Sequence, residues 1–416
     1  MELKRVVVTG IGAITPLGNN IPDYFSGLRN GVSGAGPIPY FDVSKFKTRF
    51  GCCIKNFDPL NYWDKKEARK LDPFTQYALI SSDEAILDSG LDMNAIDKTM
   101  AGVIWASGIG GIDTLFKEVQ EYFKGLENPR FSPFLVPKMI SDIAAGHISM
   151  KHGLHGPNFC VTSACASSTN GLIDAYLYIS NGIADVIVSG GSEFPMTHPS
   201  LGGFSSMKAL SERNDDFLTA SRPYDKDRDG FVMGEGGGAL ILEEYEYAKK
   251  RGAKIYAELV GIGATADAYH ITAPHPEGLG AALAMNNALK FAGIKTSDID
   301  YVNTHGTSTP LGDIAEIKAI TKVFGDDVYR MNISSTKSMT GHMLGAAGAI
   351  EALACIFALQ EQTIPPTINH FTDDPEIDSK LDLTFNTAKK RDVKYALSNT
   401  FGFGGHNATV IFKKPD

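Results

Sequence analysis

This chain of 416 residues has few cysteines, no long apolar run and no excess of basic residues. The five cysteines are an odd number in a long chain, which argues against a disulfide framework and favours a reducing compartment. No run approaches the roughly 18 uninterrupted apolar residues that a membrane-spanning helix needs. The first ten residues lack the apolar core of a secretory signal. We therefore expect a cytoplasmic protein without a membrane partner.

The charge balance is acidic, because 39 basic and 48 acidic residues give a net charge of −9. A protein that binds duplex nucleic acid needs the opposite balance, so we expect no nucleic-acid partner. An acidic protein partner would have to meet a local basic patch. The 43% hydrophobic and 21% charged residues are typical of a globular protein, and the length predicts two or three structural units.

The chain contains an internal sequence repeat, which we call the sequence echo. Val8–Ala13 reads V-T-G-I-G-A and Leu259–Ala264 reads L-V-G-I-G-A, and each follows a β-rich run. Strand and helix patterns then alternate in the same order in both halves, which is typical of α/β layering. The second half is expected to close with strands at Leu383–Phe385 and Ala408–Phe412. The repeat predicts two related halves, residues 1–250 and 251–416.

Cys165 lies where a β-prone stretch turns through small residues into a helix pattern. Free N–H groups and the helix dipole at such a turn favour a thiolate, and small neighbours let a carbonyl group approach. A buried cysteine that acts as a small hydrophobic side chain fits the same turn equally well. That second interpretation is the one we adopt for the remaining cysteines, which are Cys52, Cys53, Cys160 and Cys355.

Two histidines favour the interpretation of Cys165 as a nucleophile. His305 follows a predicted strand, and α/β sheets place their sites at strand ends. His342 lies at another strand-to-helix junction, at nearly the place in the second half that Cys165 occupies in the first. Glycine beside each histidine permits close approach to a substrate. Together they predict a Cys-His-His site.

The segments around these residues resemble the signatures of the β-ketoacyl-[acyl carrier protein] synthases, most closely the elongating synthase II branch. They read V-T-S-A-C-A-S-S (161–168), T-H-G-T-S-T-P-L-G-D (304–313), K-S-M-T-G-H-M-L-G-A-A-G (337–348) and N-T-F-G-F-G-G-H-N (399–407). The resemblance implies a thiolase-like, duplicated α-β-α-β-α fold with two halves related by a pseudo-twofold axis.

The resemblance also implies a decarboxylating Claisen condensation without a bound cofactor or metal. Cys165 would carry the acyl chain, and His305 and His342 would stabilise the enolate formed from malonyl-carrier protein. The backbone N–H groups of Cys165 and Phe403 would form the oxyanion hole. Substrates would arrive on the phosphopantetheine arm of acyl carrier protein.

Further residues match the family's pattern, with core packing or a structural ion-pair network as the alternative. Charged groups near the histidines would fix their tautomers and tune their charge. These groups are Asp313, Glu316, Lys337 and Glu351. Thr307 and Thr309 match the residues that bind the pantetheine arm, Phe401 and Phe403 match a gating loop, and Ile109 and Phe204 match the lining of the acyl pocket.

Carrier docking is expected on a basic segment. Lys66, Arg69 and Lys70 have the spacing of one helix face, with Lys208 as a further contact. A solvated helix face is the alternative for such a cluster. A homodimer is implied by the resemblance alone.

Other classes fit less well. Gly261–Ala266 matches a dinucleotide fingerprint, but no helix pattern follows it. His147, His152 and His155 lack further ligands at metal spacing, so a structural role is favoured. A thiolase would carry a second cysteine in the C-terminal glycine loop, and a synthase III would replace one histidine by asparagine. A non-catalytic chain-length factor would lack Cys165. A ketosynthase of a related polyketide or polyene pathway stays open, and so does the acyl chain length.

Overall fold

Ten strands form one continuous mixed sheet in the computed structural model, which describes residues 3–126 and 128–415. In chain order they are β1 (Val6–Ile14), β4 (Ala101–Ala106), β5 (Asn158–Val161), β6 (Val186–Glu193), β7 (Gly236–Glu244), β8 (Ala257–Ala266), β9 (Tyr301–Asn303), β10 (Asn332–Ser334), β13 (Tyr395–Gly402) and β14 (His406–Lys413). Two small hairpin-like sheets lie outside it, β2–β3 (Gly36–Pro37, Phe50–Gly51) and β11–β12 (Thr363–Ile364, Lys389–Lys390).

The strand order repeats on either side of the sheet's centre. It runs β10-β9-β13-β14-β8-β1-β7-β6-β4-β5, so that β8 and β1 meet in the middle as antiparallel neighbours. Outward from each of them come two antiparallel pairings and then two parallel ones. The central strands β1 and β8 contain the two copies of the sequence echo. The predicted duplicated α/β fold is confirmed, and residue 250 ends helix α9 (Tyr245–Lys250) just before β8.

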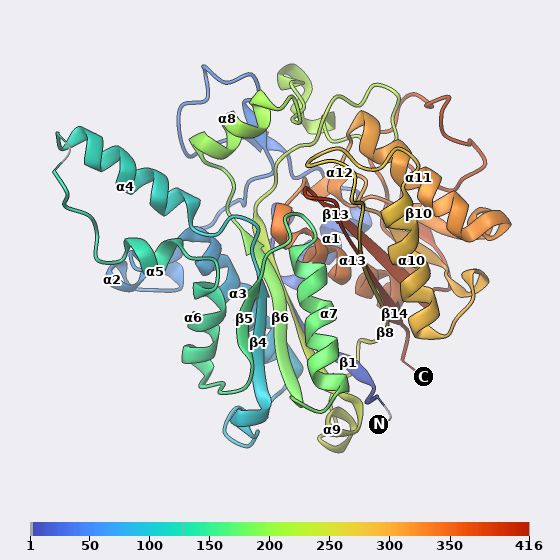
Figure 1. Ribbon diagram of the computed structural model, residues 1–416, viewed down its shortest axis with the longest axis horizontal. Helices are drawn as coiled ribbons and strands as arrows, with labels where there is room; N and C mark the ends of the chain where they lie inside the picture. The colour runs from blue at the N-terminus through green and yellow to red at the C-terminus, as the bar shows by residue number, and fades with distance from the viewer. Residues whose placement is uncertain (1–2, 127, 416) are drawn as a thin grey trace.

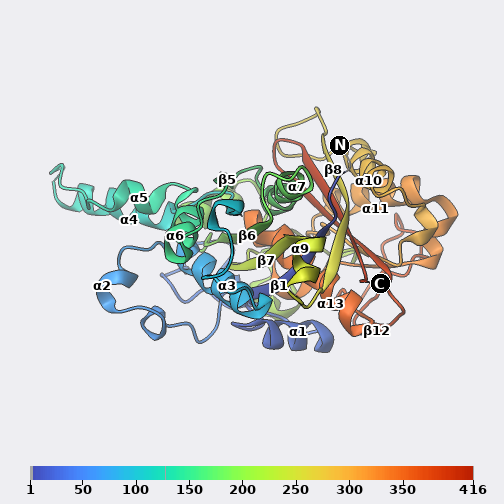
Figure 2. The ribbon, with the colours of Figure 1, turned by 90° about the horizontal axis from the view of Figure 1, so that it is seen from below.

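Helices form the layers around this sheet (Figures 1 and 2). Helices α7 (Ser167–Ser180) and α13 (Ala347–Glu361) pack on each other in the central layer. Helices α3 (Pro73–Ser89) and α6 (Ile143–His152) cover the first half, and α10 (Leu279–Ala292) and α11 (Pro310–Phe324) cover the second. Three hydrophobic clusters fill the spaces between these layers, as the predicted five-layer order requires.

Other helices lie at the ends and edges of the layers, namely α1 (Ile21–Asn30), α2 (Lys65–Ala68), α4 (Ile112–Lys124), α5 (Leu135–Met139) and α8 (His198–Ser206). The short helix α12 (Lys337–Thr340) is buried in the interior. Helices α4 and α5 project from the side of the molecule next to α2 (Figure 1). One stretch of the described chain, Leu344–Glu361, is long and apolar enough to cross a membrane by length and composition, but 89% of it is buried inside the protein. It is the helix at the centre of the fold.

One strand prediction is wrong. Leu383–Phe385 forms a loop, because Thr384 has a positive φ of 48° that an extended strand does not allow. The strand that pairs with β9 and β14 is β13, and it includes the first residues of the glycine-rich segment that begins at Asn399.

Candidate active site

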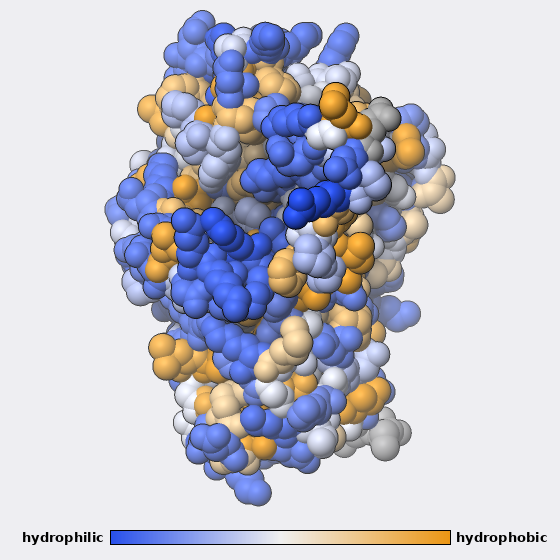
Figure 3. All heavy atoms as spheres, turned by 90° about the vertical axis from the view of Figure 1, so that its left-hand side faces the viewer, coloured by the Kyte–Doolittle hydropathy of each residue, from blue (hydrophilic) through white to orange (hydrophobic). Residues whose placement is uncertain are grey.

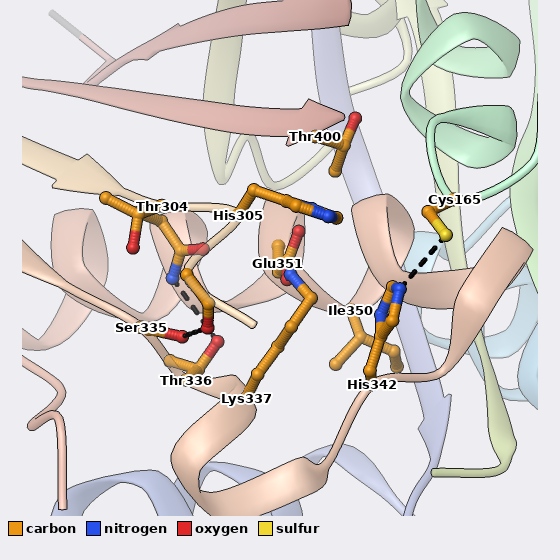
Figure 4. A network of polar contacts seen from close by, with 12 residues as sticks. Cys165, Thr304, His305, Ser335, Thr336, Lys337, His342, Ile350, Glu351 and Thr400 are labelled. Atoms are coloured by element: carbon orange, nitrogen blue, oxygen red, sulfur yellow. Dashed lines mark hydrogen bonds and ion pairs between the residues drawn. The ribbon is translucent and has the colours of Figure 1, made fainter. Parts of the chain in front are cut away.

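Cys165 occupies a tight turn between β5 and α7. Ala164 adopts the left-handed backbone conformation (φ 51°), which reverses the chain just before the helix begins at Ser167. The Ser167 hydroxyl accepts the N–H of Ser163 at 2.8 Å and donates to the carbonyl of Ala164 at 2.6 Å. These contacts lock the turn, which points the Cys165 side chain toward the second half of the protein (Figure 4).

The structure brings the three predicted residues together (Figure 4). Nε2 of His342 lies 3.0 Å from Sγ of Cys165. The ring of His305 lies 5.3 Å from that of His342, centroid to centroid, and perpendicular to it. His342 precedes α13 as Cys165 precedes α7, so the internal repeat places the thiol and one imidazole at matching points of the two halves.

Both histidines are neutral at physiological pH. Burial lowers the pKa of His305 and of His342 well below the ordinary value, and the charge of Lys337 lowers both further. Lys337 reaches its ion-pair partner Glu351 from between the two histidines (Figure 4). Lys337 therefore helps to keep both histidines neutral, in line with the expectation that it tunes their charge. A neutral imidazole carries one N–H, which it can donate to a developing negative charge.

The expectation that the helix terminus favours a thiolate is wrong for the resting site. Burial raises the pKa of Cys165 to about 12, and the carboxylates of Glu193 and Glu351 oppose ionisation as well. Lys337 and the backbone N–H of Phe403 act in the opposite direction without offsetting burial. The thiol is protonated, and Nε2 of His342 is adjacent to receive its proton.

Glu316 and Asp313 hold the loop that carries His305, and they do not touch the imidazole rings. Glu316 accepts the backbone N–H groups of His305 and Gly306 at 2.9 and 2.8 Å. Asp313 lies 3.6 Å from the guanidinium of Arg228. Neither histidine Nδ1 has a hydrogen-bond partner among the described residues. These two carboxylates therefore make no hydrogen bond to either imidazole ring, and the contacts of Glu316 position the backbone that carries His305.

A cavity of about 400 Å³ opens onto the three residues. Of the predicted substrate-binding residues, Thr307, Thr309, Phe401, Phe403 and Phe204 line it, and Lys208 lies on its wall. Ile109 is not among its lining residues in the described chain, and 36% of its side chain is exposed. The wall is mainly apolar, as an acyl chain requires.

Gly402 lines the cavity and packs closely against the turn that carries Cys165. A Cβ atom at residue 402 would lie 3.1 Å from the backbone nitrogen of Cys165 and 2.7 Å from the carbonyl oxygen of Ser163. The backbone N–H of Phe403 acts on the Cys165 thiol and lowers its pKa. Glycine at 402 keeps a side chain away from the backbone nitrogen of Cys165, one of the two predicted oxyanion donors.

The basic docking segment differs from the predicted helix face. Helix α2 ends at Ala68, so Arg69 and Lys70 follow it in a turn. Lys70 pairs with Glu67 at 2.6 Å, and the ammonium of Lys138 donates to the Arg69 carbonyl at 3.2 Å. The segment is largely exposed, and Lys138 adds a cation beside it that the sequence pattern did not reveal.

No group of three or more histidine, cysteine or acidic side chains that could hold a metal ion occurs in residues 3–126 and 128–415. Of the three histidines that cluster in the sequence, His152 instead contacts the carboxylate of Asp83 at 2.9 Å.

Residues 3–248 match the family model described as beta-ketoacyl synthase, N-terminal domain, and residues 256–371 match the corresponding C-terminal domain. The chain belongs to the β-ketoacyl synthase family. This synthase is 49% identical over 414 residues to the 3-oxoacyl-[acyl-carrier-protein] synthase 2 of Synechocystis sp., covering 100% of this chain and 99% of the relative. It is 47% identical over 411 residues to the protein of the same name from Staphylococcus aureus, with 99% and 98% coverage.

Solved structures agree with this assignment. A β-ketoacyl synthase from Burkholderia phymatum is 34% identical, with a TM-score of 0.91 over 99% of this chain and 100% of its own. The ketosynthase of a type II polyketide system, solved with its acyl-carrier protein, is 33% identical, with a TM-score of 0.91 over 100% of both chains. The synthase is an acyltransferase with the thiolase-like fold.

One buried group beside the site is marked by none of the signature motifs. Glu193 ends strand β6 and is completely buried, and its charge raises the pKa of Cys165. The only signal in the sequence is an acidic residue directly after the small residues Gly190–Ser192 at the end of an apolar strand.

Proposed function

We propose that the synthase elongates a fatty acyl chain by two carbons, in a decarboxylating condensation of malonyl-[acyl carrier protein] with an acyl group held on Cys165. The observation that carries the proposal is the 3.0 Å contact between Nε2 of His342 and Sγ of Cys165, with the neutral His305 ring beside it. The names of the relatives support the same reaction.

Acylation comes first. Sγ of Cys165 attacks the carbonyl carbon of the acyl thioester, and the new S–C bond replaces the bond to the pantetheine sulfur. The thiol proton passes by way of Nε2 of His342 to the departing sulfur. This relay is needed because burial raises the pKa of Cys165 to about 12.

Decarboxylation follows when the malonyl thioester enters. The bond to its carboxylate breaks, carbon dioxide leaves, and the electron pair forms an enolate. Its oxygen accepts an N–H from His305 and one from His342, both of which are neutral in a buried site. The relay leaves Nε2 of His342 without a proton, so His342 first changes to the tautomer that carries its proton on Nε2. The two donors supply the charge stabilisation, so we propose that no cofactor stays bound.

Condensation completes the cycle. The enolate carbon attacks the acyl carbonyl on Cys165, and the backbone N–H groups of Cys165 and Phe403 stabilise the oxyanion. The bond between Sγ of Cys165 and the acyl carbon then breaks, the thiolate takes up a proton from water, and a 3-oxoacyl thioester leaves on the carrier. Thr307 and Thr309, whose hydroxyls lie 3.0 Å apart in the cavity wall, bind the pantetheine arm.

Acyl carrier protein is the proposed partner, docked on Lys66, Arg69, Lys70 and Lys208. These cations offer an acidic carrier the local positive surface that the net charge of −9 does not. A structural neighbour that was solved with its own acyl-carrier protein supports this partner class. The cytoplasm, where thiols stay reduced, is the proposed location.

A homodimer is part of the proposal. Strand β5 ends the sheet order with only β4 beside it, which leaves an edge available for pairing. The projecting α4–α5 segment exposes apolar side chains, among them Phe123 of α4 at 62% and Leu126 in the turn after α4 at 92%. Figure 3 shows this side of the molecule, where hydrophobic groups interrupt a mainly hydrophilic surface. A second copy would cover both features.

A type II polyketide ketosynthase is the second candidate function. The ketosynthase of a type II polyketide system matches at 33% identity, and a ketosynthase/chain length factor matches at 32%. The 47–49% identity to 3-oxoacyl-[acyl-carrier-protein] synthases favours fatty acid elongation.

The test is intact-protein mass after incubation with acyl-carrier proteins of several chain lengths, followed by malonyl-carrier protein. We expect an acyl adduct on Cys165 that clears as the carrier-bound chain grows by two carbons. The variant Cys165→Ala should form no adduct yet retain some malonyl decarboxylation, and Cys160→Ala is the matched control that should behave as wild type. His305→Ala or His342→Ala should lose decarboxylation. An adduct formed only from acyl-coenzyme A would overturn the proposal in favour of a thiolase.

A further inference from the structure

Glu193 forms a closed hydrogen-bond cluster beside the catalytic turn. Its Oε1 accepts the hydroxyl of Ser107 at 2.9 Å and the N–H of Ile109 at 3.2 Å. Its Oε2 accepts the N–H of Gly108 at 2.7 Å and that of Gly345 at 3.0 Å. Four donors therefore converge on one completely buried side chain. An interior carboxylate with this many donors fixes whatever backbone carries them.

The donors come from both halves of the protein. Residues 107–110 follow strand β4 in the first half, and Gly345 lies three residues after His342 in the second. A Cβ atom at Gly345 would lie 2.2 Å from the nitrogen of Gly108 and 2.7 Å from Oε2 of Glu193. Only glycine allows the two segments to meet on the carboxylate this closely.

The cluster favours the ionised form of the side chain. A protonated carboxyl would turn its own O–H toward one of the donors, and the four contacts would then lose one partner. Burial raises the pKa of Glu193 to about 7, and the hydrogen bonds from Ser107, Gly108, Ile109 and Gly345 lower it. Glu193 has no ion-pair partner among the described residues.

We infer that Glu193 is a positioning residue for the condensation, whose carboxylate ties the turn that carries His342 to the loop that carries Ile109. Without this tie the turn is free to move relative to Cys165, which lies in the first half. The inference rests on the proposed function in taking Cys165 as the nucleophile. A second consequence follows from the charge, because a fixed negative group near Cys165 opposes formation of the thiolate.

Several other charged or titratable groups act on Cys165. Lys337 and the Phe403 N–H favour the thiolate, and Glu351 opposes it. The neutral rings of His342 and His305 complete the surroundings. A Glu193 variant keeps all of these groups. A change in the pKa of Cys165 in that variant therefore measures the effect of removing the Glu193 carboxylate.

The test variant is Glu193→Gln, which keeps the size of the side chain, removes its charge, and turns an NH₂ group toward backbone donors. We expect the pH profile of Cys165 alkylation by iodoacetamide to move to lower pH by about one unit. We also expect kcat for condensation to fall by about tenfold or more, because a small displacement of a catalytic group is costly. Malonyl decarboxylation should fall together with it.

Two further variants separate the positioning role of Glu193 from the effect of its charge on Cys165. Glu193→Asp keeps the charge but is too short to reach all four donors, so kcat should fall while the alkylation profile stays in place. Glu243→Gln removes another completely buried carboxylate at the opposite end of the β6–β7 ladder, where Glu243 faces Val186. It should leave both readouts unchanged, and thermal unfolding of each variant measures any loss of stability.

Wild-type kcat in Glu193→Gln would overturn the inference. So would an unmoved alkylation profile together with a fall in kcat no larger than that of Glu243→Gln, since this pattern would indicate a structural role only. The alkylation measurement needs no substrate. If the wild-type protein forms no acyl adduct, the proposed function fails, while the effect of Glu193 on Cys165 is still decided.

Discussion

At the scale of single residues, Gly402 controls access to the oxyanion donors. In Gly402→Ala the added methyl carbon would lie 2.7 Å from the Ser163 carbonyl oxygen and 3.1 Å from the Cys165 nitrogen. We expect kcat for condensation to fall by about 100-fold or more, the cost of losing one oxyanion donor. The control is Gly36→Ala, where the added carbon meets no atom within 4 Å. Normal turnover in Gly402→Ala would show that the Cys165 N–H plays no part.

Glu235 gives the free energy of unfolding a predictable pH dependence. Burial raises the pKa of this carboxyl to about 8 from an ordinary value of 4.5. Between these two values the folded state holds a proton that the unfolded state has lost, so stability falls as pH rises, by up to about 1.4 kcal/mol per unit from this group. Urea unfolding at pH 5, 6, 7 and 8 should show a slope that is more negative in wild type than in Glu235→Gln. Equal slopes would contradict the raised pKa.

The position of a functional residue was predictable from the sequence where a reactive side chain lies within a recognisable local pattern. Cys165 and His342 each stand at a strand-to-helix junction among small residues, so their position on the fold follows from the local sequence. The ionisation of Cys165 was not predictable, because it depends on burial by segments far apart in the chain. Glu193 escaped notice for the same reason, since its partners Gly108 and Gly345 lie in different halves.

At the scale of elements, segments with mixed signals were the ones mispredicted. Leu383–Phe385 was predicted to be a strand from its β-rich residues, but it forms a loop, and Tyr395–Gly402 is the strand that pairs with β9 and β14. Helix α2 stops at Ala68 although the spacing of its cations suggested a longer helix. Short elements have weak intrinsic preferences, so tertiary contacts set their ends.

The docking segment at α2 is tested by reversing its charge. In the double variant Lys66→Glu/Arg69→Glu, we expect KM for acyl-carrier protein to rise by about tenfold with kcat nearly unchanged, because exposed charges act mainly on association. Turnover of a small acyl-pantetheine thioester should not change. Lys290→Glu, on the exposed face of α10, is the control. An unaltered KM in the double variant would show that the carrier docks on another part of the surface.

At the scale of the whole molecule, the repeated topology explains why a site forms at all. Each half supplies one strand-to-helix junction, and packing α7 against α13 brings the two junctions together, one with a thiol and one with an imidazole. Neither half contains the site alone. The short sequence repeat in β1 and β8, together with the same order of strand and helix patterns after each copy, predicted this duplication, since a repeated α/β order leaves few alternatives for the topology.

The outer edge of the first half leads to the last prediction, on assembly. Phe123 and Leu126 are exposed at 62% and 92% on the projecting α4–α5 segment, and β5 ends the order of strands in the sheet. Burying such side chains contributes about 25 cal/mol per Å² of apolar surface, so a second copy is the simplest cover. Sedimentation velocity at micromolar concentration should give twice the mass of one chain. Phe123→Glu should shift the protein toward monomer, whereas Leu87→Glu, at an isolated leucine of α3 that is 83% exposed, should leave the dimer intact. A wild-type monomer would instead assign this surface to a different partner.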